Sequence, residues 1–181
     1  MKQMILAFAV ILSAAFCMAG FGGRAEAAGG KILVAYFSYQ GHTAGVAREI
    51  AAQTGGDLFE IKPTAPYPAY DECLDLAKAE KNSNARPAFE GGVANMAEYE
   101  VVFVGYPIWW YDAPMIVLTF LENYDLSGKT VIPFATSGGS PLSDSLASVR
   151  ASAAGATIGE GILADGPGDV APWIAGLGYA K

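Results

Sequence analysis

A polar segment, Ser38–Thr43, follows the first apolar run and reads Ser-Tyr-Gln-Gly-His-Thr. Hydroxyl groups and backbone N–H groups in front of a helix form a common binding site for phosphate and other anions. Gly41 lets the backbone approach a ligand closely, and Ser38 and Thr43 can donate hydroxyl hydrogens. The segment lacks both the Lys of a nucleoside-triphosphate loop and the three spaced glycines of a dinucleotide fingerprint. It predicts either a phosphate site or a plain strand-to-helix turn capped by Thr43.

Aromatic residues crowd a second segment, Gly105–Pro114, which also contains two prolines. The rings belong to Tyr106, Trp109, Trp110 and Tyr111. A single ring at the end of a strand usually fills the core, but four rings in a proline-stiffened loop favour a stacking surface for a flat ligand. A third segment, Thr136–Ser140, is small and rich in backbone donors. It can bind the electron-rich edge of a heterocycle, or it can simply turn the chain.

The elements that must position these segments follow from hydrophobic periodicity. Apolar runs typical of strands occur at 32–37, 58–61, 101–104, 130–135 and 157–163. Amphipathic runs typical of helices occur at 43–54, 70–81, 115–124, 142–153 and 170–177. This alternation predicts an α/β fold, a three-layer, doubly wound, five-stranded parallel sheet with strand order 2-1-3-4-5. The three segments would then meet at the carboxyl ends of the strands, where such sheets bind ligands. The stretch 62–100 is long for a simple connection and predicts a packed insertion.

Acidic residues outnumber basic ones, with 18 Asp and Glu against 11 Lys and Arg and a net charge of −7. Such a surface argues against nucleic acid, whose phosphates require Lys and Arg, and suits charge-steered encounters with basic partners. The chain has one His, and Cys73 is its only cysteine after residue 27. These ligands cannot build an ordinary His/Cys zinc site, so we expect no metal.

The first 27 residues have the pattern of a secretory signal peptide. Lys2 precedes an apolar run, Met4–Phe21, and Ala25-Glu26-Ala27 forms an A-x-A cleavage site. Cleavage removes Lys2, Arg24 and Glu26, which leaves a single domain, 28–181, with 9 basic and 17 acidic residues and a net charge of −8. The alternative is an uncleaved membrane anchor. Both readings predict an exported protein that is periplasmic, secreted or anchored on the outer side of the membrane.

Taken together, the segments resemble the flavodoxin family. Ser38–Thr43 is similar to the family's phosphate loop, usually S/T-x-T-G-x-T, although Gln40 replaces a hydroxyl residue. Gly105–Pro114 is similar to the aromatic loop over the isoalloxazine ring. Tyr124–Ser140, which reads YDLSGKTVIPFATSGGS, resembles the fourth strand and third flavin loop of one bacterial branch. The insertion resembles that branch as well, at Tyr67, Pro68, Tyr70 and Ala85-Arg86-Pro87.

The resemblance implies FMN as the cofactor. The residues that would hold its phosphate are Ser38, Gln40, Gly41, His42 and Thr43. The residues of the aromatic loop that would lie around the ring are Tyr106, Pro107, Trp109, Trp110 and Tyr111, with Trp110 as the stacking side chain. Backbone groups of Thr136, Ser137 and Gly138 would contact the pyrimidine side. The flavin carries the chemistry, so no catalytic side chain is expected.

The function implied by the resemblance is electron transfer at low potential outside the cytoplasm, with a redox protein or a small molecule as donor or acceptor. One alternative is an FMN-dependent NAD(P)H:quinone-type oxidoreductase, and a second is a module that binds flavin without catalysis. Tyr111 stands where relatives in this branch often have Gly. Many flavodoxins use a Gly peptide here to bond the flavin N5 and stabilise the one-electron-reduced state. A peptide flip is harder without Gly, so one-electron and two-electron chemistry both stay open.

Overall fold

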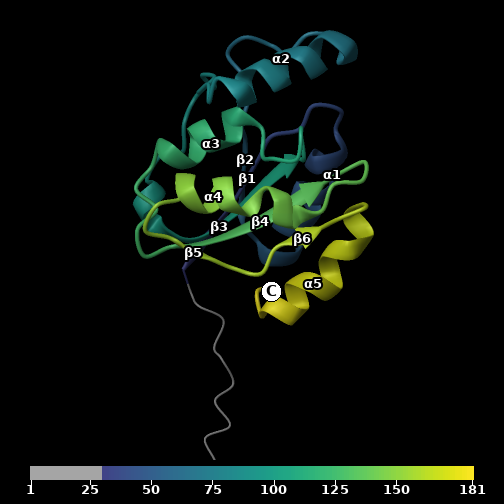
Figure 1. Ribbon diagram of the computed structural model, residues 1–181. Helices are drawn as coiled ribbons and strands as arrows, with labels where there is room; N and C mark the ends of the chain where they lie inside the picture. The colour runs from purple at the N-terminus through teal and green to yellow at the C-terminus, as the bar shows by residue number, and fades with distance from the viewer. Residues whose placement is uncertain (1–29) are drawn as a thin grey trace, which may run out of the picture.

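A parallel sheet with helices on both faces forms the body of the protein in the computed structural model, which describes residues 30–181 (Figure 1). The strands are β1 (Lys31–Tyr36), β2 (Asp57–Glu60), β3 (Tyr99–Pro107), β4 (Thr130–Thr136), β5 (Thr157–Ile158) and β6 (Ile162–Leu163). The helices are α1 (His42–Thr54), α2 (Tyr70–Asn82), α3 (Met115–Glu122), α4 (Leu146–Ser152) and α5 (Val170–Leu177). Short 3-10 turns occur at η1 (Met96–Glu98), η2 (Leu142–Asp144) and η3 (Pro167–Asp169). The predicted signal sequence, 1–27, lies outside the described residues.

The strand order is β2-β1-β3-β4-β5, with β6 also paired to β4. All of these pairings are parallel, which confirms the predicted order and fold class. The order reverses between β1 and β3, because the chain goes outward from β1 to β2 and then returns to pair on the other side of β1. The carboxyl ends of β1 and β3 therefore border the switch point, where sheets of this kind bind ligands.

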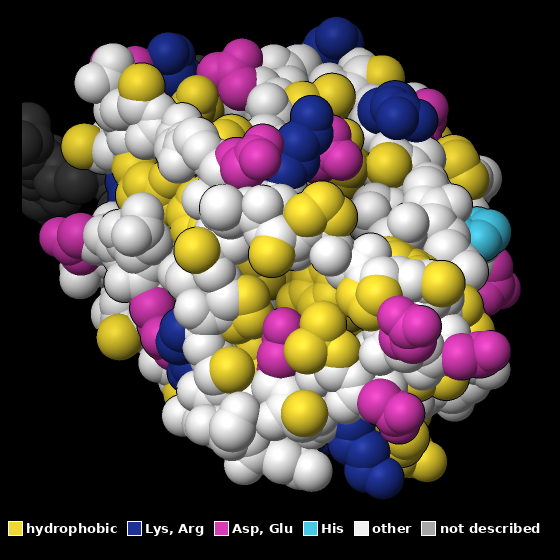
Figure 2. Space-filling view, turned by 90° about the horizontal axis from the view of Figure 1, so that it is seen from above, with side chains coloured by type: hydrophobic (Ala, Val, Ile, Leu, Met, Phe, Trp, Pro, Cys, Tyr) yellow, Lys and Arg dark blue, Asp and Glu magenta, His cyan; other side chains and the backbone are white. Residues whose placement is uncertain are grey.

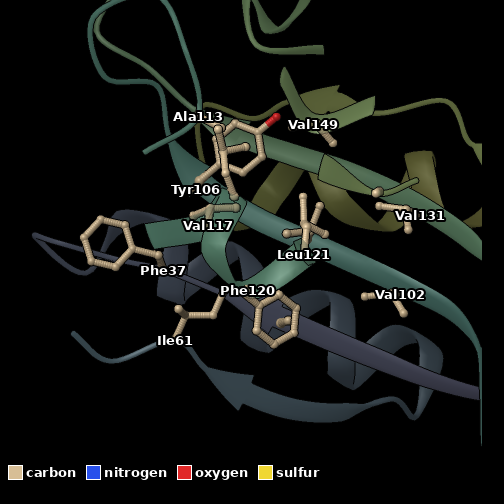
Figure 3. Packing of buried hydrophobic residues seen from close by; sticks show 14 of the residues in the cluster. Phe37, Ile61, Val102, Tyr106, Ala113, Val117, Phe120, Leu121, Val131 and Val149 are labelled. Atoms are coloured by element: carbon tan, nitrogen blue, oxygen red, sulfur yellow. The ribbon is translucent and has the colours of Figure 1, made fainter. Parts of the chain in front are cut away.

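Side chains of the central strands alternate between the two faces of the sheet, and each face has its own core. Leu33, Val102 and Val104 lie on the face covered by α3 and α4, and Figure 3 shows part of this packing around Phe120 and Leu121. Val34 and Phe103 lie on the other face, which α1 and α5 cover. Burial on both faces explains why these strands read as continuous apolar runs rather than alternating ones.

The fifth strand is interrupted, contrary to the prediction of one run over 157–163. β5 pairs with the start of β4 and β6 with its end, and the residues between them leave the ladder. N–H groups of the interrupted strand donate to alternate β4 carbonyls, those of Lys129, Val131 and Ala135. By the same alternation Pro133 faces the gap, and it has no N–H to offer. Gly161 passes directly over the Pro133 carbonyl, where a Cβ would collide.

Two other boundaries differ from prediction and matter for the site. The predicted helix 142–153 begins with the separate turn η2, and α4 follows only after Ser145. Strand β3 continues to Pro107, three residues beyond the predicted end at 104. Tyr106 and Pro107 therefore belong to the strand, and the aromatic loop itself begins at Ile108.

The stretch between β2 and β3 carries α2 and closes on itself. Pro63 and Phe89 form an antiparallel bridge, so the two ends of the stretch lie side by side. Helix α2 lies at the top of the view in Figure 1 and buries only Cys73 and Ala77. Across residues 30–181, none of the helices combines the length and the apolar character needed to cross a bilayer.

Candidate functional site

A hollow of about 610 Å³ opens where β1, β3 and β4 end. The predicted residues that line it are Gln40, His42, Pro107, Trp109, Trp110, Tyr111, Thr136, Ser137 and Gly138. A smaller hollow of about 70 Å³ is lined by several of the same residues together with Ser38 and Thr43. The fold therefore brings the three predicted segments together around one space. Seen from above, from the side where α2 lies in Figure 1, hydrophobic side chains are exposed among acidic and basic ones (Figure 2).

Two predicted residues do not line either hollow. Gly41 has φ +88° and sits immediately before α1, where it turns the chain. Tyr106 is fully buried, because strand alternation directs it into the core beside α3 and α4. Ser145 donates its only hydroxyl hydrogen to the Leu142 carbonyl at 2.9 Å, so the Tyr106 hydroxyl donates to Ser145 at 2.9 Å. Burial raises the pKa of Tyr106 to about 12. Tyr106 is thus a core residue of β3, and the expectation that it lies beside a ligand is corrected.

The first loop presents free N–H groups at the start of α1. The Ser38 hydroxyl oxygen accepts hydrogen bonds from the N–H groups of Gly41 at 3.1 Å and Ala44 at 3.2 Å. No acceptor within residues 30–181 faces the N–H groups of Gln40, His42 and Thr43. These groups lie at a helix N-terminus, whose partial positive charge favours an anion.

Thr43 joins the first loop to the third instead of capping α1. Its side chain is 1% exposed, and its hydroxyl lies 2.9 Å from that of Thr136 at the end of β4. One hydroxyl of this pair donates to the other, so the accepting hydroxyl keeps its own hydrogen for a further partner. Both residues line the smaller hollow, where that hydrogen can reach an anion.

The second loop is a tight hairpin at Trp109–Asp112. The N–H of Trp109 donates to the Asp112 carbonyl at 2.9 Å, and the reverse bond is 3.0 Å long. The two central residues, Trp110 and Tyr111, have φ of +50° and +63°. Positive φ at both positions is typical of a type I′ turn, which normally carries Asn or Gly. Each bulky residue in this region costs about 1–2 kcal/mol, so the turn is strained.

The two tryptophans of this loop are held by different parts of the protein. The Trp109 ring packs edge-on against Phe37, Tyr39 and Tyr67, with centroid distances of 5.2, 5.7 and 5.1 Å. The Trp110 indole N–H donates to the carbonyl of Leu74 in α2 at 2.9 Å. Both rings line the hollow, but Trp109 is set by the aromatic core and Trp110 by α2.

Helix α2 supplies a wall of the hollow that sequence reasoning did not assign to it. Its lining residues are Tyr70, Cys73, Leu74 and Ala77. Their spacing of 3, 4 and 7 along a helix places them on one face, which is a signal visible in the sequence. Burial raises the pKa of the Cys73 thiol. Asp165, beyond β6, also lines the space and was not predicted.

A family profile described as Flavodoxin matches residues 31–176. The chain belongs to the flavodoxin family.

Two Bacteroides proteins assigned as flavoproteins are similar to this flavodoxin-family chain. The one from Bacteroides eggerthii DSM 20697 is 40% identical, with a TM-score of 0.74 over 82% of this chain and 98% of that one. The one from Bacteroides uniformis ATCC 8492 is 39% identical, with a TM-score of 0.75 over 81% and 99%. A flavoprotein from Lactobacillus acidophilus NCFM, solved in complex with FMN, is 22% identical, with a TM-score of 0.67 over 80% and 98%. That last likeness shows a shared fold. No curated protein sequence matches the chain.

The strained turn of this flavodoxin-family protein yields a stability prediction. Tyr111→Gly is expected to raise the free energy of unfolding by about 0.5–1 kcal/mol, because relief of left-handed strain exceeds the extra entropy that Gly loses on folding. Little packing is lost, since Tyr111 is 66% exposed. Urea denaturation of the wild type, Tyr111→Gly and the control Tyr111→Ala measures the effect. A less stable Gly variant would show that the turn is not strained at this position.

Proposed function

We propose that the chain binds FMN in the hollow and transfers electrons with it outside the cytoplasm. The observation that carries the proposal is the junction of free N–H groups at the start of α1 with the aromatic wall beside them. Membership of the flavodoxin family supports it, as does the FMN complex of a protein with the same fold.

The residues present fit FMN. The volume of about 610 Å³ lies within the range of about 300–1,000 Å³ that ligand sites usually occupy. The N–H groups of Gln40, His42 and Thr43 suit a phosphate, and Trp109, Trp110 and Tyr111 offer flat faces for the ring. The backbone of residues 136–138 lies across the hollow, where it can meet the polar edge of the ring.

Bound flavin would supply the capacity to accept and release electrons, and the protein sets how strongly it does so. The lining within residues 30–181 contains Asp165 but no Lys or Arg. Such a lining disfavours additional negative charge in the hollow. It would therefore lower the reduction potential of bound flavin and make the protein a strong electron donor.

The deciding experiment is an FMN titration of the chain from Ala28 onward, followed by stepwise anaerobic reduction monitored by absorbance. Saturable binding with a one-electron stage supports the electron carrier. Binding with a direct two-electron change, together with NAD(P)H oxidation, supports the reductase. No FMN binding would remove both functions and leave only the fold.

The reductase is the second candidate, and one feature of the site favours it. The α2 wall adds the apolar side chains of Tyr70, Leu74 and Ala77 to the hollow. A second flat, neutral molecule could rest against this wall beside the flavin. The rigid turn at Trp110 and Tyr111 also lacks the Gly that makes a peptide flip easy.

Export is part of the proposal and rests on residues 1–27. We expect the protein recovered from outside the cytoplasm to begin at Ala28 when the full chain is expressed, which N-terminal sequencing would test. A protein that keeps Met1–Phe21 and sediments with membranes would indicate an anchor. The proposed partners are a redox protein or a small-molecule donor or acceptor, and the acidic surface favours a basic protein.

Thr43 gives a direct test of the phosphate position. Thr43→Val is expected to weaken FMN binding about tenfold and riboflavin binding by less than about twofold, because a hydrogen bond to a charged group is lost only with FMN. Fluorescence quenching titrations with both flavins measure the two affinities. Thr43→Ser keeps the hydroxyl and serves as the control. Equal losses for FMN and riboflavin would remove the phosphate from this loop.

A further inference from the structure

Helix α2 is fastened to the second loop by two lysines that lie one turn apart. The Lys81 ammonium donates to the backbone carbonyl of Trp110 at 2.6 Å and lies 3.6 Å from the Asp112 carboxylate. The Lys78 ammonium lies over the Trp110 ring, 4.8 Å from its centroid. Lys81 thus contacts the backbone of the turn, whereas Lys78 contacts only a side chain.

The Lys81 contact falls on the strained part of the loop. The Trp110 carbonyl belongs to the peptide between the two residues with positive φ. The Asp112 side chain is 13% exposed and also accepts a hydrogen bond from the Ala113 N–H at 2.8 Å. One ammonium therefore binds the centre of the turn and its closing residue together. A charged donor on a carbonyl is among the stronger hydrogen bonds in proteins.

We propose that Lys81 is a positioning residue for the ligand-binding loop. Its ammonium keeps the Trp110 carbonyl directed toward α2 and holds the Trp110–Tyr111 peptide in one orientation. Aromatic residues can then occupy a turn that normally carries Asn or Gly, and their rings stay at the wall of the hollow. Lys81 precedes Trp110 by 29 residues in the chain, so its contact with the loop makes α2 part of the site. The inference deepens the proposed function, because the loop held in this way is the one assigned to the flavin ring.

The opening of the turn can be measured without any ligand. The Asp112 N–H is protected by the Trp109 carbonyl, so its hydrogen exchange reports opening of the hairpin. In Lys81→Met we expect exchange of this amide to accelerate about tenfold, as for the loss of one charge-assisted hydrogen bond. The Phe37 N–H, bonded to the Gly105 carbonyl inside the sheet, is the internal reference and should not change.

Matched variants separate positioning from general effects. Lys78→Met removes a charge from the same helix and a contact with Trp110, but it leaves the carbonyl bond intact, so Asp112 exchange should stay within about twofold of wild type. Lys81→Arg keeps a charged donor and should restore most of the protection. Unchanged Asp112 exchange in Lys81→Met would overturn the proposal. An equal change in Lys78→Met, or acceleration at Phe37 as well, would also overturn it.

Flavin titration of the same variants links the result to function. We expect Lys81→Met to weaken FMN and riboflavin by the same factor, since the loop holds the ring and not the phosphate. Faster Asp112 exchange with unchanged affinity for both flavins would overturn the positioning role toward the ligand. If the wild type binds no flavin, the proposed function fails, while the exchange measurement still decides whether Lys81 holds the turn.

Discussion

Trp109→Ala is expected to lower the free energy of unfolding by about 2–3 kcal/mol, somewhat less than the cost of removing a fully buried large ring. Trp109 is the centre of an aromatic group, and its ring contacts Phe37, Tyr39 and Tyr67 edge-on. These partners come from the end of β1, the first loop and the stretch before α2. Loss of the ring would therefore loosen the packing among these three segments, and Tyr39 and Trp109 both line the hollow. Flavin affinity should fall together with stability. Urea denaturation and FMN titration measure the two effects.

Trp110→Ala is the matched comparison. Its ring is 36% exposed and is held by α2, so the free energy of unfolding should change by less than about 1 kcal/mol. If Trp110 stacks on the ligand, its removal should still weaken the free energy of flavin binding. The loss should exceed the contribution of the buried area by about 0.5–1.5 kcal/mol. Unchanged flavin affinity would assign the stacking surface to Trp109 or Tyr111. Equal stability losses in the two variants would contradict the separate anchoring of the two rings.

Gly105→Ala is the second change with a large expected effect. It should lower the free energy of unfolding by about 2–3 kcal/mol, because the added methyl group overpacks the core. Gly105 in β3 is paired with Phe134 in β4, and a Cβ at Gly105 would collide with the edge of the Phe134 ring. Phe134 is fully buried, so its ring has no free space to enter. Strand β3 leads directly into the aromatic loop, so the displacement should also weaken flavin binding.

Gly138→Ala is the control for this prediction. A Cβ at Gly138 meets no described atom within 4 Å, and this variant should stay within about 0.5 kcal/mol of wild type. Phe134→Leu in the Gly105→Ala background should recover part of the loss, because the smaller side chain frees volume beside the new methyl group. A Gly105→Ala protein as stable as wild type would show that the two strands separate easily at this register.

The sequence alone was enough to predict the fold and the location of the candidate site. Runs such as 101–104 are continuously apolar because their strands are buried on both faces, and that property is local. The loops that follow β1 and β4 are also marked locally, by Gly and hydroxyl residues beside apolar strands. Parallel topology then brings these loops to one edge of the sheet without further information.

The tertiary structure decided which side chains face the hollow. Tyr106 turns into the core because β3 runs on to Pro107 and keeps its alternation, a boundary that propensity does not locate. Pro133 in β4 splits the neighbouring strand, although nothing within 157–163 itself marks the break apart from its glycines. Thr43 meets Thr136, and Lys81 meets Trp110, across 93 and 29 residues of chain. Such contacts depend on how elements that are distant in the sequence pack together, so hydrophobic periodicity and local motifs cannot predict them.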